Sequence, residues 1–244
     1  MTVTAKEFQL WRGRVAAQHT VAELCRTVGL KRSTLAQQLV RGRIPLSTVI
    51  GVARAYGLNP LASLAEFEGY HDVESGTRPP TDAELVSQVC HVDILRLLVV
   101  RSQRLQRVGA DLGVNLSPFP HGTSVRSWIE AIDPGDLRQQ LSARTGIARQ
   151  NLSAQLTAGK LAPAILVEAA RIADVSLTNG LVVGGYISAD EAAWPEDARE
   201  RALARMSDAD LAWLGRDRLD NLGKQIRKSE LDERTDKLMW ENLG

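Results

Sequence analysis

Apolar residues recur along most of this chain at the three- and four-residue spacing of helices, not at the alternating spacing of strands. Leu24, Leu30, Leu35 and Leu39 fall on one side of two successive short helices. Ser/Thr-x-x-Glu pairs, typical of N-terminal capping boxes, precede periodic segments at Thr4/Glu7, Thr20/Glu23, Thr81/Glu84 and Ser188/Glu191. Asn59-Pro60 and Asp133-Pro134 add caps followed by proline at the first helical position. The pattern predicts an all-α fold.

One helical segment of the first half is repeated 117 residues later. "GLKRSTLAQQLVRGR" (29–43) returns as "GIARQNLSAQLTAGK" (146–160), with its apolar residues kept and most polar residues changed. At this constant offset, ten identities without a gap fall within residues 11–58. They are Trp11/Trp128, Leu24/Leu141, Gly29/Gly146, Arg32/Arg149, Leu35/Leu152, Gln38/Gln155, Leu39/Leu156, Gly42/Gly159, Ala53/Ala170 and Arg54/Arg171. We interpret this as a duplication.

Breaks rich in Pro, Gly and Ser divide the chain at residues 74–82 and 115–124. The expected parts are a first domain (1–72), a helical linker or tail (73–122), a second domain (123–188) and a C-terminal helical tail (189–244). Within the linker, Thr81 to about Val108 is expected to form one helix, on the order of 40 Å long at 1.5 Å per residue. That length is comparable with one DNA turn of about 34 Å.

The first copy is expected to form two short helices joined by a tight turn. The turn passes through Gly29, which suits a positive φ, and Gly42 suits the position after the second helix. The buried leucines leave an outward face of Arg32, Ser33, Thr34, Gln37, Gln38 and Arg41. Two helices with a polar outer face on the second are typical of the helix-turn-helix that enters the DNA major groove, where Arg, Gln, Asn, Ser and Thr read bases and phosphates.

The run "TVAELCRTVGLKRSTLAQQLVRGRIPLSTVIGVARAYGLNPLASL" (20–64) resembles the lambda-repressor-like (Cro/XRE) DNA-binding domains, from their second to their fifth helix. The matching features are a leucine in helix two, the Gly-apolar turn, a polar start to the recognition helix, "RGR" and a helix ending in "AYGL". The second copy (137–181) matches less closely, with Asp174 in the place of Gly57. With their first helices the two domains cover about half of the chain.

The resemblance implies which residues face DNA in each copy. Base-reading positions fall on Lys31, Arg32, Ser33, Thr34 and Gln37, and on Ala148, Arg149, Gln150, Asn151 and Ala154. Phosphate contacts are implied for Thr20, Gln38, Arg41 and Arg43, and for Arg138, Ser153, Gln155 and Lys160. Ala148 and Ala158 replace Lys31 and Arg41, so the second copy either binds more weakly or serves as scaffold. A solvated surface of small helical bundles remains the alternative for both.

Composition and charge exclude several classes of protein. The chain has 244 residues, 44% hydrophobic and 24% charged, and a net charge of +1, unlike a disordered chain or an unselective coat for nucleic acid. No apolar run reaches the ~20 residues of a membrane span, and no signal sequence is seen, so we expect a cytoplasmic, nucleoid-associated protein. Cys25 and Cys90 are too few for a disulfide framework or a zinc site. Residues 1–117 carry +4 and residues 118–244 carry −3.

No catalytic or cofactor motif appears, so no enzymatic activity, cofactor or metal is expected. The four histidines His19, His71, His91 and His121 lack metal-ligand spacing, and Asp232-Glu233 lies in a charged tail. The sequence instead predicts a repressor whose two unlike helix-turn-helix domains read an asymmetric double-stranded DNA operator. Linking them in one chain makes the second binding event intramolecular.

The overall resemblance is to immunity repressors of temperate phages that infect actinobacteria. The sequence shows no β-rich C-terminal region in which a Ser–Lys self-cleaving peptidase could lie, so autoproteolysis is not expected. A host transcriptional regulator and an antitoxin-like DNA-binding or protein-interaction adaptor are the alternatives. The apolar stripe Leu211, Leu214, Leu219, Leu222 and Ile226 is expected to pack against its own domain. Homodimerisation through this tail, or an additional DNA contact by Arg216, Arg218, Lys224, Arg227 and Lys228, is the other interpretation.

Overall fold

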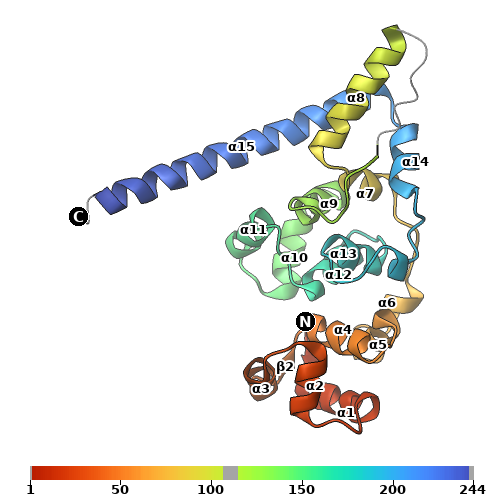
Figure 1. The fold of residues 1–244 in the computed structure, drawn as a ribbon, viewed down its shortest axis with the longest axis vertical. Helices are drawn as coiled ribbons and strands as arrows, with labels where there is room; N and C mark the ends of the chain where they lie inside the picture. The colour runs from red at the N-terminus through yellow and green to blue at the C-terminus, as the bar shows by residue number, and fades with distance from the viewer. Residues whose placement is uncertain (1, 107–114, 242–244) are drawn as a thin grey trace. The chain divides into compact units, whose positions relative to one another are not determined.

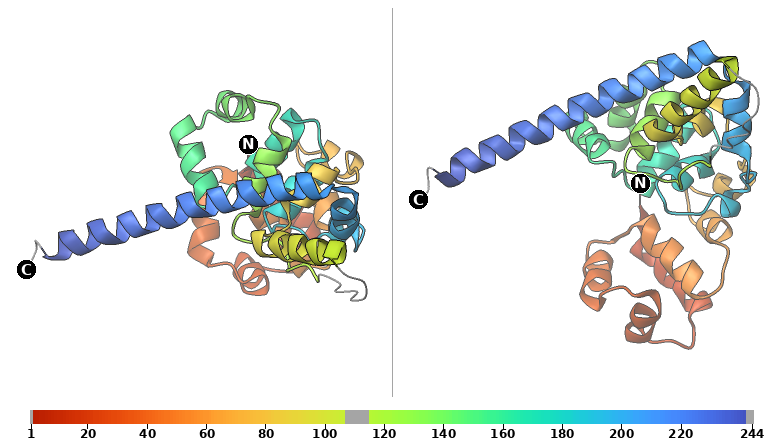
Figure 2. Two further views of the ribbon diagram at one scale, coloured as in Figure 1. Left: turned by 90° about the horizontal axis from the view of Figure 1, so that it is seen from above. Right: turned by 45° about the horizontal axis from the view of Figure 1, so that its top comes forward.

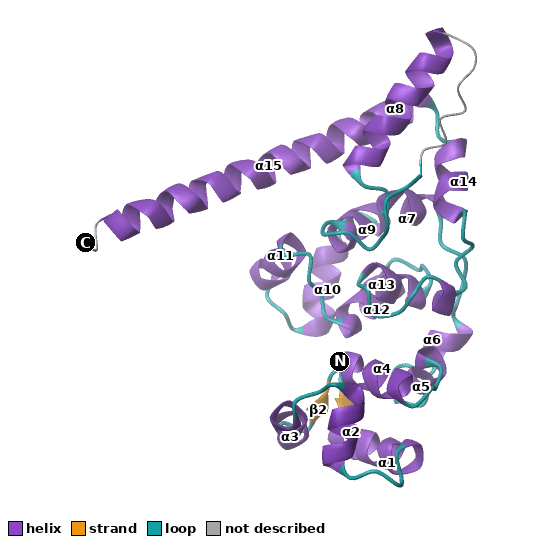
Figure 3. Cartoon of the chain, in the orientation of Figure 1, coloured by secondary structure: helices purple, strands orange, loops and turns teal. Residues whose placement is uncertain are grey.

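The computed structural model describes residues 2–106 and 115–241, and most of these residues are helical (Figures 1 and 3). The helices are α1 (Ala5–Val15), α2 (Val21–Val28), α3 (Arg32–Val40), α4 (Leu46–Ala55), α5 (Pro60–Ala65), α6 (Asp72–Ser75), α7 (Asp82–Ser87), α8 (His91–Gln106), α9 (Ser124–Ile132), α10 (Leu137–Thr145), α11 (Arg149–Thr157), α12 (Pro163–Ile172), α13 (Leu177–Val183), the 3₁₀-helix η1 (Asp190–Ala192), α14 (Ala198–Arg205) and α15 (Asp208–Glu241). The expected all-α fold class is confirmed.

A short antiparallel ladder joins the N-terminus to the segment that follows α3. Strands β1 (Val3–Thr4) and β2 (Arg43–Ile44) pair with Val3 opposite Ile44 and Thr4 opposite Arg43. Val3 and Ile44 are buried, so the ladder closes one end of a hydrophobic core. It also holds the end of α3 next to the start of α1.

The described chain forms two compact units that group its segments differently from the four parts expected from the sequence. Unit 1 comprises residues 1–88 and 119–199, and unit 2 comprises residues 89–118 and 200–244. Both copies of the repeat therefore lie in unit 1. Helices α8, α14 from residue 200 onward, and α15 form unit 2.

Three of the four expected capping boxes begin an α-helix. Thr4, Thr20 and Thr81 each accept a hydrogen bond from the backbone N–H three residues on, and the glutamate there accepts one from the cap's own N–H. Such reciprocal bonds satisfy N–H groups that have no partner inside the helix. Ser188 and Glu191 form the same pair of bonds, but the segment that follows is the 3₁₀-helix η1.

Of the two expected Asx-Pro starts, one is correct and one is wrong. Asn59 caps α5 by accepting from the N–H groups of Leu61 and Ala62. Asp133 does not start a helix at Pro134, because its carboxylate accepts from the N–H of Gly135, whose φ is 118°, and from that of Leu137. This turn delays α10 to Leu137.

The repeat seen in the sequence is also present in the backbone. Helices α3 and α4 match α11 and α12 residue for residue at the offset of 117. Trp11 and Trp128 are both buried, and Gly29 and Gly146 both have a φ of 71°. Asp174, in the place of Gly57, keeps the left-handed conformation with a φ of 51°. The two copies therefore share their turns as well as their helices.

The single helix expected from Thr81 to about Val108 is wrong, although Val108 itself lies outside the described residues. The chain leaves the helical conformation at Gln88, between α7 and α8. Gln88 is fully buried, and its side-chain amide donates to the Ser87 hydroxyl at 2.7 Å and to the Ser124 carbonyl at 3.3 Å. These contacts draw α7 into unit 1, so no continuous 40 Å helix separates the two copies.

A buried polar network joins α7 to the second copy. Glu84 has no exposed surface, and its Oε1 accepts from Trp128 Nε1 at 3.0 Å and from Asn179 Nδ2 at 2.9 Å. Asn179 Oδ1 in turn accepts from Trp194 Nε1 at 2.9 Å. Each of these buried donors would be costly without its partner. The capping glutamate of α7 therefore also fixes α9, α13 and the segment after η1.

Two ion pairs join the two copies within unit 1. Arg54 of α4 donates to Glu191 at 3.2 and 2.6 Å, and Arg171 of α12 donates to Asp72 at 2.7 and 3.1 Å. Arg54 and Arg171 are equivalent in the repeat, but their carboxylate partners are not, since Asp72 matches Ala189 and Glu191 matches Glu74 at the offset of 117. Helix α4 also contacts its own counterpart α12. Only this contact between equivalent helices is of the kind that a two-fold axis generates.

The Glu84 network provides a test of this arrangement. Glu84→Ala is expected to lower the free energy of unfolding by roughly 3–5 kcal/mol, because it leaves two buried donors unpaired and opens a cavity. Urea unfolding followed by tryptophan fluorescence measures the loss. Glu23→Ala is the matched control, since Glu23 also belongs to a capping box but is only half-buried, and it is expected to cost about 1 kcal/mol. Equal losses for both variants would contradict the role given to Glu84.

Candidate nucleic-acid interface

A tight turn between α2 and α3 positions the expected reading face of the first copy. Gly29 ends α2 in the left-handed conformation, and the Leu30 N–H donates to the Cys25 carbonyl at 2.9 Å. Glycine reaches this conformation without the strain that a side chain causes. Leu24 and Leu35, both with no exposed surface, hold α2 and α3 against the core. The opposite side of α3 is thereby left to solvent.

The structure leaves the expected contact residues of the first copy accessible. Thr34 and Gln38 are half-buried, and the other seven are exposed. The exposed residues are Thr20, Lys31, Arg32, Ser33, Gln37, Arg41 and Arg43. Thr20 is the N-cap of α2, and Arg43 belongs to β2. The other five lie on α3 or next to one of its ends. The surface that they form is called the α3 face below.

The cations of the α3 face differ from most other arginines of unit 1 in having no carboxylate partner. Among the described residues, none forms an ion pair with Lys31, Arg32, Arg41 or Arg43. Residues 24–65 contain six Lys and Arg and no Asp or Glu. Elsewhere in the unit arginines are paired, as in Arg14–Glu66, Arg54–Glu191, Arg78–Asp174 and Arg171–Asp72. The positive charge of the α3 face is therefore not neutralised by neighbouring side chains.

Two polar residues assigned to phosphate contacts are already engaged within the protein. The Thr20 hydroxyl donates to Glu23 at 2.7 Å, and these hydrogen bonds lower the pKa of the Glu23 carboxyl below its ordinary value. The ionised carboxylate at the start of α2 repels a phosphate there. Gln38 Oε1 accepts from the Thr48 hydroxyl at 3.1 Å, which leaves the amide N–H groups of Gln38 as donors. Gln38 is thus better suited than Thr20 to donate a hydrogen bond to a phosphate.

Two apolar residues on the α3 face were not among the contact residues predicted from the sequence. Ala36 is exposed and Val40 is 89% exposed, although both are apolar. Helical spacing places them on the same side as Ser33 and Gln37. Ala36 and Val40 lie three and seven residues after Ser33, so helical spacing in the sequence was sufficient to find them. Small apolar side chains at such positions contact the methyl group of thymine in known complexes.

The second copy presents a similar face on α11. Leu141 and Leu152 are buried, and Gly146 makes the turn. Gln155 is half-buried, and the other expected residues are exposed. These are Arg138, Ala148, Arg149, Gln150, Asn151, Ser153, Ala154 and Lys160.

The second face carries less positive charge than the first. Residues 137–167 contain no Asp or Glu and four Lys and Arg. One of these four, Arg144, donates to the buried Glu168 at 2.8 Å. Arg138, Arg149 and Lys160 remain without an ion-pair partner among the described residues. This face therefore offers fewer free cations to a polyanion.

The described part of the chain holds no candidate metal cluster and no helix that could span a membrane. No group of three or more His, Cys, Asp and Glu side chains lies in a suitable arrangement for a metal ion. None of the described helices is both long and apolar enough to span a bilayer. A crevice of about 360 Å³ in unit 1 is lined in part by Tyr70, Glu168 and Arg171. Burial raises the pKa of Tyr70 to about 12, so this phenol is protonated at neutral pH.

Comparison with known proteins returned no family model, no curated protein and no solved structure that matches this chain.

Proposed function

We propose that this chain is a sequence-specific, double-stranded DNA-binding repressor built on two tandem helix-turn-helix domains of the lambda-repressor-like type. The observation that carries the proposal is the α3 face. It combines four unpaired cations with base-reading residue types on a helix whose other side is buried. A protein-binding surface of this size would be expected to be apolar at its centre. Here the exposed residues of α3 are mostly polar or charged, with Ala36 and Val40 the apolar ones among them.

The junction between the two copies suggests how the domains share an operator. Helix α4 contacts its own counterpart α12, as equivalent elements do across a two-fold axis. Helix-turn-helix dimers of that symmetry bind half-sites that run in opposite directions, about one DNA turn apart. The reading residues differ between α3 and α11, however, so the half-sites differ in sequence. One chain then covers an asymmetric operator in which two unlike halves are inverted.

The first domain supplies most of the affinity in this proposal. Its α3 face has Lys31 and Arg41 where the second copy has Ala148 and Ala158. Phosphate neutralisation provides the salt-dependent part of DNA affinity, and α11 offers fewer cations for it. The second domain adds sequence preference. Because it is already fixed beside the first, its own binding to DNA is intramolecular and takes place at a high effective concentration.

The biological role that we propose is repression of the immunity type found in temperate phages of actinobacteria. It follows from the overall resemblance and from the helical character of the described residues outside the two repeats. When both domains cover the operator, they block binding of a competing protein such as RNA polymerase. A host transcriptional regulator that uses the same two domains is the second candidate. The antitoxin-like adaptor is less well supported, because Arg32 and Ser33 are not the residues of a protein-pairing surface.

Arg32→Ala tests the base-reading role of α3. We expect at least tenfold weaker binding to the preferred duplex and a smaller loss on unrelated DNA, since a bidentate arginine contact distinguishes bases by about 1–3 kcal/mol. Titration of both duplexes by fluorescence anisotropy measures the two losses. Arg14→Ala is the control, because Arg14 is exposed in the same domain but pairs with Glu66. Affinity of the Arg32→Ala variant within twofold of the original would show that α3 is placed wrongly.

Arg41→Ala tests a contact with the phosphate backbone. The variant is expected to bind all duplexes more weakly by a similar factor, because it loses charge but no base contact. The slope of log affinity against log salt concentration should fall by about one. A loss confined to one sequence would instead assign Arg41 to base reading.

Selection of bound sequences from random DNA tests the arrangement of the half-sites. The expected product is one site with two unlike halves, inverted and about 10 base pairs apart. Native mass spectrometry of the selected duplex at nanomolar concentration should show one chain bound. A perfect palindrome carrying two chains, or two halves in direct repeat, would contradict the arrangement that we propose.

A further inference from the structure

Helix α15 leaves the packed part of unit 2 with apolar side chains exposed. Leu211, near its start, is fully buried, whereas Leu219 is 42% exposed, Ile226 49% and Leu231 60%. The helix continues to Glu241, well beyond the region that packs on α8 (Figures 1 and 2). The expectation that the stripe Leu211 to Ile226 packs against its own domain therefore holds only for its beginning. The rest is open to solvent, and the described chain does not indicate what would cover it.

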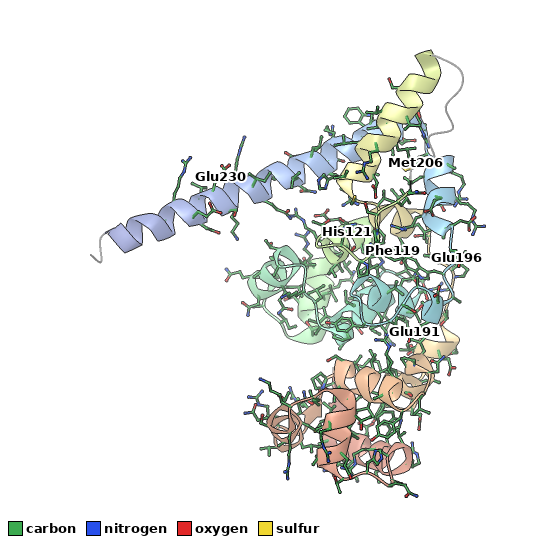
Figure 4. The ribbon with its side chains drawn as sticks, in the orientation of Figure 1. Phe119, His121, Glu191, Glu196, Met206 and Glu230 are labelled. Carbon is green, nitrogen blue, oxygen red and sulfur yellow. The ribbon has the colours of Figure 1, made fainter. Side chains whose placement is uncertain are left out.

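The junction between the two copies in unit 1 is built from polar contacts of defined geometry. Arg54 of α4 donates to both carboxylate oxygens of Glu191, which is labelled in Figure 4. Arg171 of α12 donates to both carboxylate oxygens of Asp72 and, at 3.3 Å, to the carbonyl of Gly69. Two-point contacts of a planar guanidinium fix an orientation as well as a distance.

A third arginine fastens the connection between the copies. Arg78 follows α6, and its guanidinium donates to the carboxylate of Asp174 at 3.0 Å and to the carbonyl of the same residue at 2.9 Å. Its own backbone N–H donates to the Ser176 hydroxyl at 3.0 Å. Asp174 and Ser176 lie between α12 and α13, so the chain that leaves α6 is held against the second copy.

These three sets of contacts, called the arginine clamps below, lie near the surface of the junction. They are the pairs Arg54–Glu191, Arg171–Asp72 and Arg78–Asp174. In each clamp at least one side chain is about half exposed: Arg54 is 45% exposed, Asp72 51% and Arg78 55%. Loss of one of these three side chains therefore leaves no cavity in the core.

The partners that remain after such a loss are still paired. Glu191 also accepts from the Ser188 N–H at 2.7 Å, and Arg171 Nε lies 3.7 Å from the carboxylate of Glu168. The clamps can thus be opened from their exposed side without leaving an isolated buried charge.

We propose that the arginine clamps are positioning residues that set the distance and angle between the α3 face and the exposed face of α11. This inference rests on the proposed function. A fixed pair of reading helices gains a high effective concentration only on half-sites at the matching distance and on the matching side of the duplex. A loose pair accepts several spacings and gains less from each. The clamps thereby make the protein distinguish operators by half-site spacing, while α3 and α11 distinguish them by base sequence.

The competing explanation is that the packing of helices at the junction fixes the arrangement by itself. Helix α4 contacts α12, and α6 contacts α13, where Val73 of α6 is fully buried. In that case removal of the clamps would leave the preference for spacing as it was. The two explanations therefore differ in the ratio of two affinities measured on one protein.

Titrations by fluorescence anisotropy with two duplexes provide the test. One duplex is the site selected from random DNA, and the other carries about 5 additional base pairs between its halves, which turns one half-site by about half a helical turn. The original chain should bind the second duplex at least about tenfold more weakly, because only one face can then engage. For Arg54→Ala/Asp72→Ala/Arg78→Ala, which removes one member of each clamp, this ratio should fall below about threefold. A change in net charge affects both duplexes alike and cancels in the ratio.

Arg14→Ala/Asp220→Ala is the control, since it breaks two exposed ion pairs that lie within the first domain and within α15. The partners are Glu66 and Lys224. This variant should keep the ratio of the original chain. Far-UV circular dichroism checks that each variant keeps its helices. A duplex with the first half-site alone should be bound within about twofold by all of them, because the α3 face is unchanged.

A second variant, Arg54→Lys/Arg78→Lys, keeps the charges but cannot form two-point contacts, and its ratio should lie between the other two. An unchanged ratio in both the alanine and the lysine variants would overturn the proposal and leave the proposed function standing. Equal binding of both duplexes by the original chain would also overturn it, since the faces would then not be held in one arrangement. Failure of the original chain to prefer the selected site over unrelated DNA would instead overturn the proposed function, and this proposal with it.

Discussion

Two bidentate ion pairs, of Arg54 with Glu191 and of Arg171 with Asp72, join the two copies of the repeat within unit 1. Each pair is partly exposed and contributes only about 1 kcal/mol or less. Their value lies in their direction, since bidentate guanidinium contacts fix an orientation as well as a distance. They hold both copies in one body, and the two polar faces on α3 and α11 are then displayed as a fixed pair.

The repeat shows which residues this arrangement constrains. The retained leucines and glycines build the turn between the paired helices, and the retained Arg54 and Arg171 build the junction between the copies. The outer positions of α3 and α11 have meanwhile changed, from Ser33-Thr34 to Gln150-Asn151. Divergence on the exposed faces, with the turn glycines, several core leucines and the two junction arginines kept, is the pattern expected when one scaffold recognises two different partners or sequences.

Much of the fold could be predicted from sequence because it depends on local chemistry. The Thr-x-x-Glu caps, the glycines with positive φ and the helical spacing of leucines act within a few residues, and the structure confirms them. The break after α7 could not be predicted in this way, since it depends on Gln88 meeting Ser124 far along the chain. The same holds for Glu84, which looks like an ordinary capping residue until Trp128 and Asn179 reach it. For the candidate site, the polar positions of the α3 face followed from the helical pattern and the family resemblance, and the same helical spacing would also have found Val40.

The distribution of acidic residues explains how a chain with a net charge of only +1 can present a strongly basic face. Carboxylates are absent from residues 24–65 and concentrated where they hold other arginines, as at Asp72 and Glu191, or along α15. Surface fields fall off within about 10 Å at moderate salt, so a polyanion near α3 senses the local charge and not the average. Charge order along the sequence, more than net charge, therefore determines what each surface of this protein can bind.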